Sequence, residues 1–261
     1  MKNDLFSIGP LTIHGYGLMI AIGVLAAYLV GEYRAKKNNL NPEPVFAITF
    51  LCLIGGLLGA KLLFFITDIK EILENPKVLL DLSYGFVVYG GILGGILTFY
   101  IYSRYKKLNF LQYFDILIPS VALAQGFGRI GCFLAGCCYG MESSCPFSIT
   151  FHSSEFAPNG IPLIPTQLIS SGLNFIHFFL LIYLAKKVKA HGQIAALYLI
   201  LYSAGRFILE FFRGDLIRGS VGALSTSQFI SIFTFLAGII FFWFCGKKYK
   251  KGTGLSESGT P

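Results

Sequence analysis

Residues 44–67 read PVFAITFLCLIGGLLGAKLLFFIT, and Lys61 is the only charged side chain among them. A helix needs about 20 apolar residues to cross the hydrocarbon core of a bilayer. This run satisfies that length with a single charge, so the sequence predicts a transmembrane helix here. The same test can then be applied to the rest of the chain.

The composition of the whole chain agrees with a membrane protein. Its 261 residues are 54% hydrophobic and 13% charged, and 30 of them are glycine. A soluble domain usually has about 25% charged residues, so this chain cannot cover a water-facing surface. Glycine allows helices to pack closely in lipid. We expect one integral membrane domain over residues 1–250 and a disordered cytoplasmic tail over 251–261, because that tail is rich in Gly, Ser and Thr.

Seven apolar runs of suitable length predict an all-α membrane protein with seven transmembrane helices. The expected spans are residues 16–34, 44–67, 86–104, 112–136, 164–185, 193–212 and 226–246. The fourth span contains Asp115, Pro119 and Arg129. We therefore expect this span to bend or to end early, because proline removes a helical hydrogen bond.

Thirteen of the 21 lysines and arginines lie in loops or helix ends that share one side of the membrane if seven spans alternate. They are Arg34, Lys36, Lys37, Arg104, Lys106, Lys107, Lys186, Lys187, Lys189, Lys247, Lys248, Lys250 and Lys251. The segment 137–163 contains neither lysine nor arginine. Loops rich in Lys and Arg remain in the cytoplasm, so we expect the N-terminus outside and the C-terminus inside. The net charge of +8 then reports topology and does not indicate nucleic-acid binding.

Ionisable side chains inside spans are the best indication of function, because each costs roughly 2.5–3.5 kcal/mol to insert. In GRFILEFFRGD, residues 205–215, Arg206 and Glu210 are four apart and share a helix face. They form either a structural ion pair or part of a binding site. Arg213 and, in span four, Arg129 add further positive charge at the outer level. An anionic head group would balance that excess, and arginine binds phosphate through two parallel hydrogen bonds.

Several uncharged residues at the same level have both a binding and a structural interpretation. Gly126, Gly128 and Gly131 surround Arg129, where they either admit a ligand or allow close helix packing. Gln167, in the IPTQL motif at the start of span five, either binds a ligand or caps the helix. Nothing in the sequence separates these interpretations.

Three further side chains are expected at the outer membrane surface. His14 precedes the first span and either orients a head group or transfers a proton. Tyr16 and Tyr89, at the outer ends of spans one and three, either contact a ligand or belong to an interfacial aromatic belt. All three are therefore candidate site residues.

Four of the six cysteines lie close together in the sequence, at Cys132, Cys137, Cys138 and Cys145. Their spacing lacks the C-x2-C pairs of structural zinc sites, so we expect no metal site. A disulfide in the outer segment and small buried packing residues are the other two interpretations.

The chain resembles the bacterial phosphatidylglycerol–prolipoprotein diacylglyceryl transferases. The motifs that carry the resemblance are IHGYGLM, YGGILGG, GFGRIGCFLAGCCYG, PTQL and GRFILEFFR, in this order. The resemblance implies a seven-span inner-membrane enzyme without a cofactor, with its active site towards the periplasmic face. It implies that the diacylglyceryl group of phosphatidylglycerol is transferred to the lipobox cysteine of a prolipoprotein signal peptide, which releases glycerol 1-phosphate.

The resemblance also implies roles for individual residues. The essential arginines of the family fall on Arg129 and Arg206, its acid on Glu210 and its N-terminal tyrosine on Tyr16. This chain departs from the family signature at three positions, where Cys132 replaces asparagine, Cys137 replaces glutamate and Tyr89 replaces a histidine. Tyrosine is a weak base at neutral pH because its pKa is near 10. His14 and Glu210 are then the local candidates for a general base.

Two other functions fit the same residues. An anion or lipid transporter would use the same arginines and transfer no group. A membrane thiol-redox protein would use Cys132, Cys137 and Cys138. Transfer of diacylglyceryl to a lipobox peptide distinguishes the enzyme from both.

Overall fold

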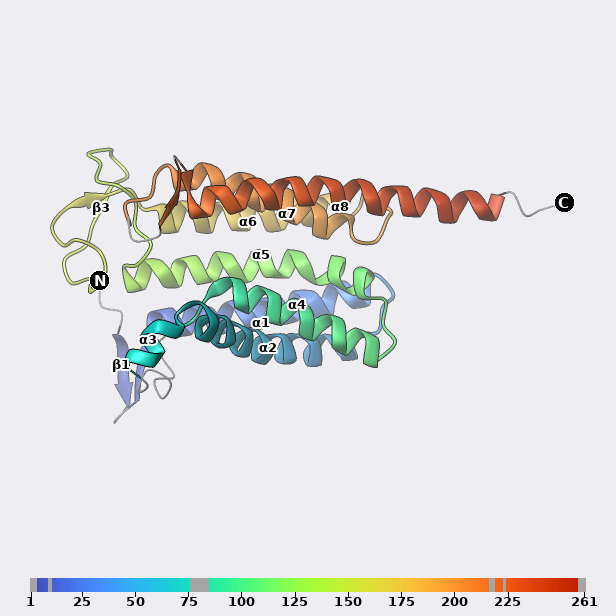
Figure 1. Ribbon diagram of the computed structural model, residues 1–261, viewed down its shortest axis with the longest axis horizontal. Coiled ribbons are helices and arrows are strands. Elements are labelled where there is room, and N and C mark those ends of the chain that lie inside the picture. The colour runs from blue at the N-terminus through green and yellow to red at the C-terminus, as the bar shows by residue number, and fades with distance from the viewer. Residues whose placement is uncertain (1–3, 9–10, 76–84, 216–218, 223, 258–261) are drawn as a thin grey trace. The chain divides into compact units, whose positions relative to one another are not determined.

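The computed structural model describes residues 4–8, 11–75, 85–215, 219–222 and 224–257, and most of them are helical (Figure 1). The helices are α1 (Gly15–Lys37), α2 (Glu43–Thr67), α3 (Ile69–Glu74), α4 (Val88–Tyr105), α5 (Phe110–Ala135), α6 (Thr166–Leu184), α7 (Gln193–Glu210) and α8 (Thr226–Glu257). All except α3 have 18 residues or more. The expected helical class is thus confirmed.

Three short antiparallel strand pairs lie outside the long helices. They are β1 (Asp4–Ile8) with β2 (Leu11–His14), β3 (Ile149–Thr150) with β4 (Pro162–Leu163), and β5 (Ser220–Val221) with β6 (Leu224–Ser225). The sequence did not predict these strands, because two to five residues are too few to establish a period of two.

Six of the helices described here are long and apolar enough to cross a membrane, namely α1, α2, α5, α6, α7 and α8 over Thr226–Lys250. The α4 helix has 18 residues but ends in the polar sequence YSRY, which makes it less apolar. Helix α8 continues to Glu257, past the expected limit at 246 and into the segment 251–261 that was expected to be a tail. Hydropathy marks where a chain leaves lipid, whereas a helix can continue into water.

Helix α5 does not end early, because it continues through Pro119 to Ala135, close to the expected limit at residue 136. Neighbouring helices in membrane proteins compensate for the hydrogen bond that a proline removes. Asp115 has a structural task. Its carboxylate accepts hydrogen bonds from the backbone N–H groups of Gly192 (2.6 Å) and Ala195 (2.9 Å), and so caps the start of α7.

The chain divides into two compact units, residues 31–113 and residues 1–30 with 114–261. In the unit of residues 31–113, α2 and α4 pack through the four glycines Gly55, Gly59, Gly90 and Gly94. A Cβ on any of these glycines would collide with the other helix. Small residues therefore allow the two backbones to approach closely, as in other membrane helix pairs.

The other unit contains the candidate site. Here α7 packs against both α6 and α8 (Figure 1). Helix α5 is fixed to α6 by a hydrogen bond from Ser171 Oγ to the carbonyl of Gly126 (2.9 Å). One buried core cluster of this unit consists of Ile118, Ala122, Phe178, Leu181, Ile194 and Tyr198. This packing sets the positions of α5, α6 and α7 around a cavity.

Candidate active site

A cavity of about 190 Å³ lies between α5, α6 and α7. Arg129 from α5 and Arg206 from α7 both line it. Its other lining residues are Ser170, Leu173, Asn174, Ile176, His177, Leu180, Leu201, Tyr202, Gly205 and Leu209. The structure therefore brings the two arginines, which are 77 residues apart in the sequence, to one chamber with a mostly apolar wall.

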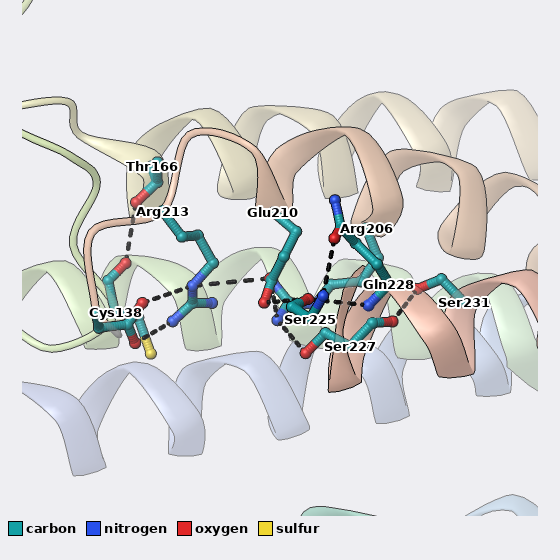
Figure 2. Close-up of polar contacts among 10 residues, drawn as sticks. Cys138, Thr166, Arg206, Glu210, Arg213, Ser225, Ser227, Gln228 and Ser231 are labelled. Carbon is teal, nitrogen blue, oxygen red and sulfur yellow. Dashed lines mark hydrogen bonds and ion pairs between the residues drawn. The ribbon is translucent and has the colours of Figure 1, made fainter. Parts of the chain in front are cut away.

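Arg206 is held from one side by the paired carboxylate of α7 (Figure 2). Its Nη2 lies 2.7 Å from Glu210 Oε2 and also donates to Ser227 Oγ at 2.9 Å. Glu210 Oε1 accepts a hydrogen bond from Ser225 Oγ at 3.0 Å. Nη1 of Arg206 is buried and has no hydrogen-bond partner among the described residues. A buried donor without a partner is costly, and an oxygen atom of a ligand in the cavity would satisfy it.

Arg213 is the second cation beside Glu210, at 4.0 Å from Nε to Oε2. Its guanidinium binds Asp215 through two atoms, Nε at 2.8 Å and Nη2 at 2.5 Å. Burial alone would lower the pKa of Arg213, but hydrogen bonds to Asp215 and to the sulfur of Cys138 raise it. Arg213 therefore stays protonated and paired.

The charges of the site leave one arginine without an acidic partner. Glu210 pairs with Arg206, and Asp215 pairs with Arg213. Among the residues that the structure describes, Arg129 has neither an ion pair nor a hydrogen bond, although it lines the cavity. An anion in the cavity would balance this charge, and a phosphate would match the planar guanidinium.

Polar residues of α6 complete the cavity, and the sequence analysis missed them. Ser170, Asn174 and His177 all line the cavity and are spaced four and three residues apart, which places them on one face of the helix. His177 stacks on Tyr198 with ring centroids 5.1 Å apart, and its Nε2 is buried without a partner in the described structure. The signal that could have found them is a polar stripe at helical period in an apolar span.

The remaining candidates lie in different places. Tyr16 borders the site at the start of α1, because a Cβ on Gly131 would lie 3.1 Å from its ring, and it interacts electrostatically with Arg129. Gly128 faces open space, whereas Gln167 is buried and donates to the carbonyl of Cys137 at 2.9 Å.

Two candidates lie on elements other than α5, α6 and α7. His14 ends β2 and is exposed, immediately before α1. Tyr89 lies on α4 in the unit of residues 31–113, where 44% of its surface is exposed. His14 does not line the cavity.

The end of α5 gathers three thiols. Gly136, at φ 77°, donates to the carbonyl of Phe133, and Cys137 N–H donates to the carbonyl of Cys132, each at 3.1 Å. This Schellman ending brings the side chains of Cys132 and Cys137 together. Cys138, at φ 61°, adds its sulfur, and the three Sγ atoms lie within 4.8 Å of one another.

The three thiols form no disulfide with one another, and their surroundings lower the pKa of one of them. Hydrogen bonds from the thiols of Cys132 and Cys137 lower the pKa of Cys138, and the charge of Arg213 acts in the same direction. The disulfide considered from the sequence does not form in this structure. Cys145 lies apart from the cluster, beside Ser148 Oγ at 3.1 Å.

Comparison with known proteins places this arrangement in a family. The family model described as prolipoprotein diacylglyceryl transferase matches residues 3–244. The chain belongs to the prolipoprotein diacylglyceryl transferase family. It is 50% identical over 242 residues to the phosphatidylglycerol–prolipoprotein diacylglyceryl transferase of Clostridium tetani, which covers 93% of this chain and 97% of the relative.

Two further relatives agree. Transferase 2 of the same description from Clostridium perfringens is 44% identical over 255 residues, covering 97% of this chain and 99% of the relative. The transferase of Finegoldia magna is 34% identical over 253 residues, covering 96% and 97%. The resemblance found in the motifs is thereby confirmed, and membership of this family of transferases does not favour the transporter or thiol-redox alternatives.

Proposed function

We propose that the chain transfers the diacylglyceryl group of phosphatidylglycerol to the lipobox cysteine of prolipoproteins, the first step of bacterial lipoprotein maturation. The product is a thioether, and glycerol 1-phosphate is released. The observation that carries this proposal is that Arg129 and Arg206 line one cavity while Arg129 lacks an acidic partner in the described structure. The relatives named for this reaction give its substrates.

The proposed placement in the membrane follows from the charged loops. Seven spans, including α4, cross the bacterial inner membrane as a single domain over residues 1–250, with the N-terminus outside and the C-terminus in the cytoplasm. The 18 residues of α4 extend about 27 Å, close to the thickness of the hydrocarbon core. Arg129 lies near the end of α5 that leads into residues 137–163, which contain neither lysine nor arginine, so the cavity faces the periplasmic side.

In the proposed mechanism the phosphodiester lies between the two guanidinium groups. The thiolate of the acceptor attacks the glyceryl carbon, and negative charge gathers on the departing phosphate. Arg129 and the free Nη1 of Arg206 stabilise that charge, and Glu210 fixes the orientation of Arg206. Tyr16, Gly131 and the open side of Gly128 border the head-group site at α5.

The candidate bases have unequal support. Glu210 is occupied by two arginines, so its role is to position Arg206. His14 does not line the cavity, and Gln167 supports the cysteine loop through Cys137.

The experiment uses the purified chain in vesicles that contain phosphatidylglycerol, together with a lipobox peptide. We expect the peptide to gain the mass of one diacylglyceryl unit, and a peptide with serine in place of its cysteine to gain nothing. Arg129→Lys should lower the rate by about 10²–10³, because a point charge cannot replace the paired donors. The matched control is Arg104→Lys, on the exposed end of α4.

Two results would count against the proposal. If the unaltered chain binds phosphatidylglycerol but leaves the peptide unmodified, while the C. tetani relative modifies it, a transport function is favoured. If Arg129→Lys retains the rate of Arg104→Lys, the phosphate is not held by a guanidinium pair.

A further inference from the structure

We propose that Cys132, Cys137 and Cys138 bind a Zn²⁺ ion as three thiolates, and that its fourth position receives the acceptor thiol of the prolipoprotein. The metal site rests only on the structure, whereas the delivery of the thiol also rests on the proposed function. The sequence spacing gave no indication of this site, because the helix end, and not a C-x2-C pair, brings the ligands together.

The distances between the sulfur atoms suit zinc. A tetrahedral ion with Zn–S bonds of about 2.3 Å separates its sulfur ligands by about 3.8 Å. The three Sγ atoms already lie within 4.8 Å of one another, so the site closes through small rotations of the side chains. Among the residues described, the cluster offers three ligands, which leaves one position open as in catalytic zinc sites.

The loop that carries the thiols is fixed at two carbonyl groups. The carbonyl of Cys137 accepts from Gln167 Nε2 at 2.9 Å, and the carbonyl of Cys138 accepts from Thr166 Oγ1 at 3.0 Å. Both donors are almost fully buried at the start of α6. The ligands are therefore held in place before any ion binds, which is what a metal site requires.

Simple packing accounts for only part of the cluster. The Schellman ending explains a contact between Cys132 and Cys137, because these positions commonly carry an apolar pair. It does not explain Cys138, which adopts a left-handed backbone at φ 61° that few residues other than glycine favour. That conformation places the Sγ atom of Cys138 within 4.8 Å of the Sγ atoms of Cys132 and Cys137.

A cationic side chain lies beside one of the three sulfur atoms. Arg213 forms a hydrogen bond with the sulfur of Cys138, and such bonds to ligands orient and tune metal sites. Thiolate ligands select zinc and copper(I) over magnesium and calcium. Zinc suits the open fourth position because it forms four-coordinate sites without redox chemistry.

The cluster lies next to the phosphate cavity. Arg129 lines the cavity, and Cys132 follows three residues later on the same face of α5, about 4.5 Å along the helix axis. Tyr16 interacts electrostatically with Arg129 and with all three cysteines, so it borders both sites. A thiol bound to the ion would therefore stand beside a lipid phosphate held by the arginines.

The step balances without an oxidant. The acceptor thiol replaces a water molecule on zinc and releases its proton to solvent. Its sulfur then forms a bond to the glyceryl carbon as the bond from that carbon to the phosphate oxygen breaks. The electron pair leaves with glycerol 1-phosphate, and the neutral thioether gives up its place on zinc to water.

This chain has Tyr89 in place of the histidine of the family signature. The bound ion would instead cause the acceptor thiol to lose its proton. A free thiol with a pKa of about 8.5 is about 3% ionised at pH 7. A thiol that coordinates a metal ion is deprotonated outright. Removal of the ion should therefore lower the transfer rate roughly thirty-fold at pH 7, from ionisation alone.

The test measures metal binding first and transfer second. The full chain is purified in detergent under reducing conditions, stripped with a chelator and reloaded with Zn²⁺ or Co²⁺. We expect about one ion per chain, as three thiolates and one open position require. Cys138→Ser should lose the ion, whereas Cys145→Ser, outside the cluster, should keep it. With Co²⁺ bound, the lipobox peptide should strengthen the thiolate-to-cobalt absorption, and its serine version should not.

The outcomes separate the two proposals. A chain that retains no stoichiometric ion overturns the metal site, even if transfer proceeds. If Co²⁺ binds but its absorption spectrum does not change when the peptide is added, the proposed coordination of the acceptor thiol is wrong. A spectrum that responds to the peptide while no diacylglyceryl is transferred supports the site and refutes the proposed function. If Cys138→Ser fails to fold, chelation of the unaltered chain replaces that variant in the test. We then expect the transfer rate to fall about thirty-fold and to recover when zinc is added. An unchanged transfer rate would contradict the inference.

Discussion

Replacement of Glu210 by glutamine should destabilise the protein far more than the same change in an exposed ion pair. The side chains of Arg206 and Glu210 expose only 12% and 7% of their surface, and they meet at 2.7 Å. Removal of one partner from a buried pair costs about 3–5 kcal/mol, because the other charge is left unpaired. For a chain of this size, each kcal/mol lowers the melting temperature by about 2–4 °C, so we expect a loss of about 6–20 °C.

The matched control is Glu32→Gln on α1. Glu32 pairs with Lys36 at 2.5 Å with the same spacing of four residues, but the lysine side chain is 59% exposed. Exposed pairs of this kind contribute about 0.3–0.5 kcal/mol. Thermal unfolding of both variants in the same detergent measures the difference. Equal melting temperatures for Glu210→Gln and Glu32→Gln would refute the view that Glu210 holds a buried arginine in place.

Two further predictions concern the scaffold, and thermal unfolding measures both. Asp115→Asn should cost about 1 kcal/mol, because it weakens the cap that accepts from Gly192 and Ala195; an unchanged melting temperature would contradict the capping role. Gly94→Ala should destabilise by about 1–3 kcal/mol, because its Cβ would meet the backbone of α2 at Gly55 and Gly59. Gly95→Ala is the control, since its Cβ would find nothing closer than 3.7 Å, and equal losses would refute the close packing.

The sequence located the long helices and the arginines because both depend on composition along one segment. Apolar runs of about 20 residues reveal membrane helices directly. Arg129 and Arg206 were recognisable as candidates because insertion of a charged side chain into a membrane costs free energy, so such residues usually have a function. That they line the same cavity could only be argued, since it depends on how α5 and α7 pack.

The rest depended on tertiary structure. Asp115 was one of the ionisable residues that suggested function, yet it caps α7 from a distant position in the chain. The thiol spacing suggested no metal site, because a Schellman ending joins residues five apart that a search for C-x2-C pairs ignores. His177 was hidden in an apolar span, where only the shared face with Ser170 and Asn174 reveals its role.

The most direct test of the central claim is a double-mutant cycle on Arg129 and Arg206, measured as kcat/KM for transfer from phosphatidylglycerol to a lipobox peptide. Lysine replacements keep the charge and remove the paired donors. If both guanidinium groups hold one phosphate, the second replacement costs much less than the first, with a coupling energy of about 1 kcal/mol or more. Additive losses would show that the two arginines act on different groups and would contradict the account.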